Sequence, residues 1–171
     1  MIKENLPIYI KRGLLALIVV LAAVLQNTPG AFAQMFSSNA MLLIPVVVSI
    51  AMFESETVSL FFGLGAGLLW DIVSIRGYFF HSVIICIAAF FISMLIRRRI
   101  RNTLLSAIIL TFATTFIHNT LYWILFILIP NSQGAAGAFF RFYLLSCVYT
   151  TLVGIVIYIM IRPIERVFKI I

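Results

Sequence analysis

Charged side chains are scarce in this sequence, and acidic ones are the scarcest. Of the 171 residues, 10% are charged, and only five are Asp or Glu. A water-soluble domain carries charge at roughly a quarter of its positions, so the soluble globular class is excluded. The hydrophobic content of 64% is typical instead of a chain that lies within a lipid bilayer.

The side chains of enzymes and metal sites are also few. Asp71 is the only aspartate, and the sequence contains no GxSxG, HExxH or Walker motif. An intramembrane aspartyl protease needs two carboxylates that share a proton. Cys86 and Cys147 lie inside apolar runs, where a free cysteine is a packing residue. We therefore expect a protein that is not an enzyme and that has no catalytic residue, no metal and no cofactor.

What the chain does have is long apolar runs, separated by short polar or basic breaks. Because an apolar helix needs about 20 residues to cross a bilayer, these runs predict an all-α polytopic membrane protein with six transmembrane helices in one bundle. All 171 residues then form a single integral membrane domain. Although Ala31-Phe32-Ala33 resembles a signal-peptidase site, we expect the first segment to be retained as a helix. The approximate spans are residues 10–26, 39–53, 58–75, 79–96, 104–129 and 139–161.

The distribution of basic residues predicts the orientation. Twelve Lys and Arg give the chain a net charge of +7. Six spans place both termini and the arginine run on one side and leave only Arg76 and Arg141 opposite, so the positive-inside rule makes the termini cytoplasmic. Basic clusters between apolar runs indicate contact with a membrane surface rather than with nucleic acid. The candidates for binding anionic lipid are Arg97, Arg98, Arg99 and Arg101.

Small residues follow one face of the third predicted span. Positions four and three apart share a helix face, and here they hold Ser59, Gly63, Gly67, Asp71 and Ser74. Glycines four apart let a second helix approach closely, so we predict that this stripe packs against a neighbouring helix or a partner. Residues 63–67 lack the spacing of a nucleotide-binding glycine loop.

Asp71 is the only carboxylate within a predicted span, where an unpaired charge is costly. We predict a buried ion pair between Asp71 and either His81 or Arg141, since both begin spans on the same side of the membrane. The alternative is a proton relay from Asp71 through His118, which needs further titratable groups in line.

Polar side chains also share one face on each of the last two spans. They predict hydrogen bonds between helices, and the alternative is an interior polar cavity that receives a ligand or a lipid. The residues are Thr111, Thr115, His118 and Tyr122 on one span and Tyr143, Thr150 and Tyr158 on the other.

Residues 62–74, with the sequence FGLGAGLLWDIVS, resemble the family of rod shape-determining proteins MreD. In that family a glycine-containing helix leads into Leu-x-Asp-hydrophobic-hydrophobic-Ser and then into a glycine turn. Asp71, Ser74 and Gly77 match this pattern, whereas Trp70 stands where the family often has a smaller aliphatic residue.

The resemblance implies a non-catalytic scaffold or adaptor in the bacterial inner membrane. It would serve the cell-elongation (rod) complex and support cell shape and peptidoglycan synthesis through helix-face contacts. The implied partners are the bitopic protein MreC, the MreB filament and RodA with its transpeptidase. The family is also thought to share its fold with substrate-binding subunits of energy-coupling-factor transporters, so a vitamin-binding subunit is the alternative function.

Overall fold

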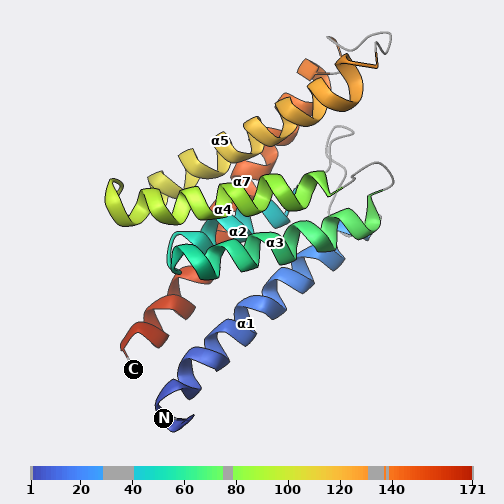
Figure 1. Ribbon diagram of the computed structural model, residues 1–171. Coiled ribbons are helices and arrows are strands. Elements are labelled where there is room, and N and C mark those ends of the chain that lie inside the picture. Colours follow the sequence, from blue (N-terminus) through green and yellow to red (C-terminus); the bar gives the residue numbers. More distant parts are fainter. Residues whose placement is uncertain (1, 29–40, 75–78, 131–136, 138, 171) are drawn as a thin grey trace.

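The computed structural model describes residues 2–28, 41–74, 79–130, 137 and 139–170, and this part of the chain is helical with no β-strand (Figure 1). Five helical segments are long and apolar enough to cross a membrane, which indicates a multi-pass membrane protein. The elements are α1 (Ile2–Asn27), α2 (Leu43–Ala51), α3 (Glu56–Val73), α4 (Phe80–Arg98), α5 (Leu104–Trp123), η1 (Ile124–Leu128), η2 (Phe139–Tyr143) and α7 (Leu144–Ile170).

The helix α2 is shorter than the predicted second span. It has nine residues and all of them are buried, so it measures about 14 Å, or half of a hydrocarbon core of about 30 Å. It contacts α1, α3, α4, α5 and α7. A helix that is apolar on every side is a core helix, and α2 fills the centre of the bundle rather than facing lipid. Residues 39 and 40 of the predicted span lie outside the described residues.

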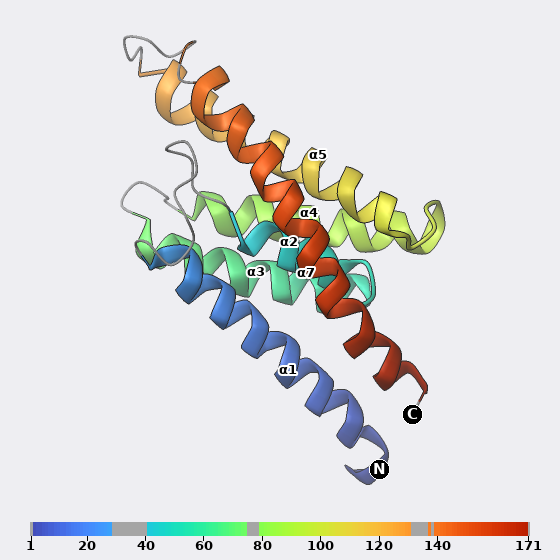
Figure 2. The ribbon, with the colours of Figure 1, turned by 180° about the vertical axis from the view of Figure 1, so that it is seen from behind.

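Two contacts show that α2 runs back alongside α1 in the opposite direction. At one end, the side-chain oxygen of Gln26 accepts a hydrogen bond from the Leu43 N–H at 3.0 Å. Beyond the other end, Glu54 forms an ion pair with Lys11, which lies about 22 Å from Gln26 along α1 by helical rise. The beginning of α1 and the end of α7 lie on the same side of the molecule (Figures 1 and 2).

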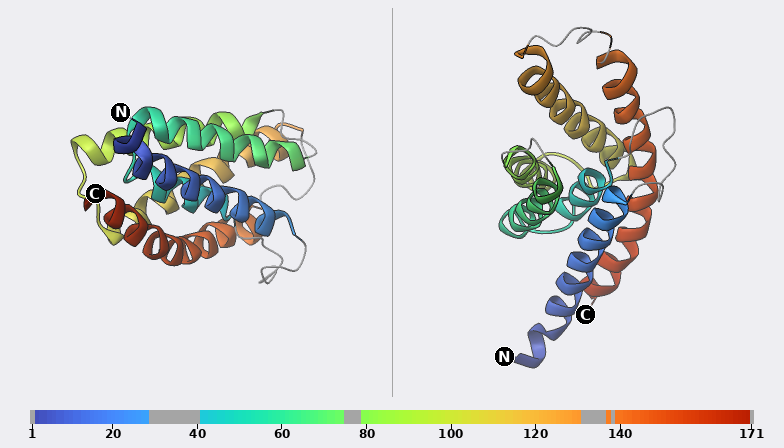
Figure 3. Two further views of the ribbon diagram at one scale, coloured as in Figure 1. Left: turned by 90° about the horizontal axis from the view of Figure 1, so that it is seen from below. Right: turned by 90° about the vertical axis from the view of Figure 1, so that its right-hand side faces the viewer.

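Around α2, the long helices form two antiparallel pairs crossed by α1. The helices α3 and α4 make a tight hairpin, which is seen nearly end-on in the right view of Figure 3, and α5 packs against α7. The pairs bury a core of aliphatic side chains that includes Leu15, Leu43, Ile50 and Ile85. Large apolar side chains are exposed on the outer faces of every long helix, as expected where lipid replaces water.

Two predicted ends differ from the structure. The last span was expected to stop at Ile161, but α7 continues through Pro163 to Ile170. Beyond Pro163, Glu165 of α7 forms an ion pair with Lys11 of α1 at 3.0 Å. The first helix begins at Ile2 rather than near Ile10, and the fifth span ends in the π-helix η1.

Candidate functional site

The glycine stripe of α3 packs against α4. A Cβ atom added at Gly63 would lie 2.8 Å from the Ala89 Cβ, and one added at Gly67 would lie 2.7 Å from the Ser82 backbone nitrogen. Ser59 on the same face is fully buried. The stripe therefore serves helix packing inside the chain, and the idea that it is open to a partner helix is wrong, because α4 already occupies it.

Asp71, in the last turn of α3, caps the beginning of α4. Its carboxylate accepts hydrogen bonds from the His81 N–H at 3.2 Å, from the Ser82 N–H at 2.9 Å and from the Ser82 hydroxyl. These N–H groups have no partner within their own helix, and a carboxylate also matches the positive end of the helix dipole. Asp71 thus closes the α3–α4 hairpin one turn beyond Gly67.

In the described part of the structure, no ion pair joins the Asp71 carboxylate to the side chain of either predicted partner. His81 meets Asp71 through its backbone N–H, while its imidazole turns toward α5. The side chain of Arg141, in η2, lies outside the described residues. Ser74 follows α3 and donates its backbone N–H to Trp70 and Asp71, so it ends the helix rather than extending the packing face.

The two histidines, far apart in sequence, meet inside the bundle. His81 Nδ1 lies 2.9 Å from His118 Nε2, and both residues are buried. The indole of Trp70 stacks on the His81 ring with centroids 4.3 Å apart. The Tyr122 ring also stacks with the His81 ring, with centroids 5.8 Å apart. This aromatic group joins α3, α4 and α5 beside the Asp71 cap, and the sequence did not predict the pairing of the histidines.

The other predicted interior polar residues bond to neighbouring groups of the protein. The Thr115 hydroxyl donates to the Thr111 carbonyl at 2.8 Å, and the Thr150 hydroxyl accepts from the Met41 N–H at 3.1 Å. The Tyr158 hydroxyl donates to Asn102 at 2.9 Å. Tyr122 and Tyr143 are half-buried, with ring centroids 6.4 Å apart. The contacts of Thr115, Thr150 and Tyr158 agree with hydrogen bonding between and within helices.

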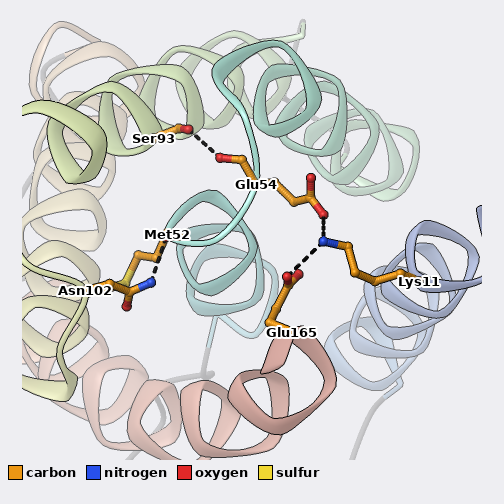
Figure 4. Close-up of polar contacts among 6 residues, drawn as sticks. All are labelled: Lys11, Met52, Glu54, Ser93, Asn102 and Glu165. Atoms are coloured by element: carbon orange, nitrogen blue, oxygen red, sulfur yellow. Dashed lines mark hydrogen bonds and ion pairs between the residues drawn. The ribbon is translucent and has the colours of Figure 1, made fainter. Parts of the chain in front are cut away.

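A buried ionic cluster joins α1, the segment after α2, and α7 (Figure 4). Lys11 of α1 pairs with Glu54, which follows α2, and with Glu165 of α7. The exposed fractions of the three side chains are 16%, 7% and 5%. Around it, the Ser93 hydroxyl donates to the Glu54 carbonyl, and the Asn102 amide donates to the Met52 carbonyl. The cluster ties three separate segments together.

Sequence reasoning missed this cluster, although a signal was present. The interior face of the last span, Thr150-Gly154-Tyr158, continues at helical spacing to Glu165. The predicted span ends at Ile161 and so leaves Glu165 outside the helix.

The arginine run ends α4. Arg97 lies 3.9 Å from Glu56 in an ion pair that is half exposed. Arg98, Arg99 and Arg101 are exposed, and none of them pairs with a carboxylate of the described part of the chain. Three unpaired guanidinium groups at one helix end attract anionic phosphate groups.

Among the described residues, apolar grooves lie on the outer surface between several of the helices. One, of about 430 Å³, runs between α1 and α3 past Ala16, Phe61 and Gly65. A second, also of about 430 Å³, lies between α1 and α7 over Val46. The third, of about 400 Å³, lies between α4 and α5 past Ala88 and Ala113. All three open toward the surface that lipid would cover.

No protein family model, no curated protein and no solved structure matches the chain. Across the described ranges, no group of three His, Cys, Asp or Glu is placed to hold a metal ion. Among the described residues, the grooves and the arginine end of α4 are surfaces open to other molecules.

Proposed function

We propose that this chain is a non-catalytic membrane scaffold, an adaptor of the bacterial cell-elongation complex of the MreD type. In this proposal both termini are cytoplasmic, and the chain supports peptidoglycan synthesis by holding a bitopic protein like MreC through helix-face contacts. The MreB filament and RodA with its transpeptidase are its further partners. The resemblance of residues 62–74 to that family motivates this choice.

The observation that carries the proposal is the open small-residue surface between α1 and α3. Gly65 faces outward, and a Cβ atom added there would have no other heavy atom within 4 Å. Ala16 of α1 and Ala66 of α3 line the same groove. Small residues let helix backbones approach closely in lipid, where no hydrophobic force drives association. A single transmembrane helix can therefore dock here, on the side of α3 that α4 leaves free.

The roles of Asp71 and the buried glycines also support a scaffold. In the segment that carries the resemblance, Asp71 caps α4 and Gly67 lets it approach. These residues fix the shape of the hairpin and so fix the outward position of Gly65. In this view the motif maintains a docking surface and takes no part in a reaction.

The test is co-purification of the full-length chain with the bitopic partner in mild detergent, followed by mass spectrometry of all bound proteins. Gly65→Leu should reduce recovery of the partner at least about tenfold, since it blocks close approach. Gly13→Leu is the matched control: Gly13 is also open, with nothing within 4 Å of an added Cβ, and it lies outside the groove.

Two results would overturn the proposal. If Gly65→Leu and Gly13→Leu both retained the wild-type partners, the groove would not be the docking site. If the wild-type chain instead carried an ATPase pair and a bound vitamin, the transporter alternative would replace the scaffold.

A further inference from the structure

The groove between α4 and α5 ends at the unpaired arginines. On α4, the lining residues Ile84, Ala88, Phe91 and Leu95 follow one helical face. Arg98, the last residue of α4, comes three residues after Leu95 and continues that face. Arg99 follows directly as the C-cap residue. Arg101 follows in the turn to α5. The apolar groove and the basic residues therefore form one continuous surface.

The helices diverge and leave the groove open along its length. From the turn at Arg101, α5 rises away from α4 (Figures 1 and 2). The opposite wall consists of Leu110, Ala113, Thr114, Ile117 and Leu121. Ala88 on one wall and Ala113 on the other have the smallest side chains in the lining.

The length of the groove fits one lipid leaflet. Ile84 and Leu95 are separated by about 17 Å of helical rise, whereas half of a hydrocarbon core is about 15 Å. An acyl chain that starts at the arginine end reaches the far end of this groove.

Charge selects the kind of lipid. Arg97 is neutralised by Glu56, but no carboxylate among the described residues pairs with Arg98, Arg99 or Arg101. Each basic residue near a membrane surface favours an anionic headgroup by about fivefold. From this complementarity we infer that the α4/α5 groove binds an anionic phospholipid, with one acyl chain in the groove and its phosphate held by Arg98, Arg99 and Arg101.

The bound lipid fills a space that the helices leave between themselves. Its chain contacts Ala88 and Ala113, and its phosphate holds the turn between the two helices. The lipid therefore acts as a structural ligand that links α4 to α5. This site is separate from the α1/α3 groove, so it does not depend on the scaffold function proposed above.

The experiment is native mass spectrometry of the purified full-length chain, titrated with phosphatidylglycerol or with phosphatidylcholine of the same acyl chains. The wild type should bind phosphatidylglycerol more tightly by about 100-fold. Arg98→Gln/Arg99→Gln should lose about 30-fold of this affinity. Arg12→Gln/Arg166→Gln removes the same charge from exposed sites on α1 and α7 and should leave the affinity nearly unchanged.

Substitutions that fill the groove test whether an acyl chain occupies it. Ala113→Phe should weaken the binding of both lipids roughly tenfold, because a ring and a chain then compete for one space. Val83→Phe, on an exposed face of α4 outside the groove, should have no effect. Ala88→Phe supplies a second filling variant from the opposite wall, and size-exclusion chromatography shows which variants are folded.

Several results would overturn the inference. Equal affinity for the two lipids, or an equal loss in the control double variant, would show that the arginines do not select the headgroup. Unchanged affinity in the groove-filling variants, or displacement of the lipid by free glycerol phosphate, would show a surface anion patch without an acyl site.

Discussion

The closest approach between α3 and α4 occurs at Gly67, and the substitution Gly67→Ala tests it. The added methyl group would lie 2.7 Å from the Ser82 nitrogen and 2.9 Å from the His81 carbonyl oxygen, and closer still to the Ser82 Cα. All three atoms belong to backbone at the start of α4, so no side-chain rotation relieves the clash. The Ser82 N–H is also bonded to Asp71 at 2.9 Å, so a shift of α4 weakens the cap.

The expected change in the free energy of unfolding is the sum of three contributions. Overpacking against rigid backbone costs up to about 3 kcal/mol, and disturbing a helix cap costs about 1 kcal/mol. Replacing a helical glycine by alanine stabilises the helix by about 1 kcal/mol. The free energy of unfolding should therefore fall by about 3 kcal/mol, which corresponds to a decrease in Tm of about 6–12 °C.

The assay is thermal unfolding of the full-length chain in mild detergent, followed by size-exclusion chromatography. Gly65→Ala is the control on the same helix, because nothing lies within 4 Å of its new methyl group, and its Tm should be unchanged or slightly higher. A Gly67→Ala variant as stable as Gly65→Ala would refute the close packing of the hairpin.

Three further substitutions test the polar contacts by the same assay. Asp71→Ala should lower the free energy of unfolding by about 2 kcal/mol, because it removes the cap of α4; an unchanged Tm would contradict the capping role. Lys11→Met should lower the free energy of unfolding by about 3–5 kcal/mol, because Glu54 and Glu165 then remain buried with no cation. Adding Glu54→Gln and Glu165→Gln should restore much of this stability. A triple variant that is no more stable than Lys11→Met would argue against the cluster. Tyr158→Phe should cost about 1 kcal/mol through the hydrogen bond to Asn102, and it should have no further effect when Asn102→Ala is already present.

The helices themselves could be predicted from local patterns. Runs of apolar residues indicated the five long helices, and the spacing of Ser59, Gly63 and Gly67 indicated a closely packed face. These features depend on residues a few positions apart on one helix. Which helix fills that face depends on the arrangement of the whole bundle, so the choice between α4 and a partner could not be made from the spacing.

The ionic cluster shows a second limit of the sequence. Glu54 and Glu165 are charged residues near predicted helix ends, where solvent exposure is the usual outcome. They are buried because α2 is short and brings the turn at Glu54 inside, next to Lys11. The contact between His81 and His118 likewise depends on how α4 and α5 meet. Helical spacing shows which face of a helix a residue lies on, but it does not show which residue of another segment lies opposite.

The central claim is that the outward-facing α1/α3 groove, beside the rigid α3–α4 hairpin, holds a partner helix. Photo-crosslinking in growing cells is the most direct test of this claim. A photoreactive amino acid would replace Phe61, which lines the α1/α3 groove and is 64% exposed, and Val148, an exposed residue of α7 outside the three grooves, would serve as control. The scaffold account predicts a crosslink from position 61, and not from position 148, to a single-pass protein of the cell-elongation complex. A crosslink from position 61 to a transporter ATPase, to lipid alone, or to the same protein as from position 148 would contradict it.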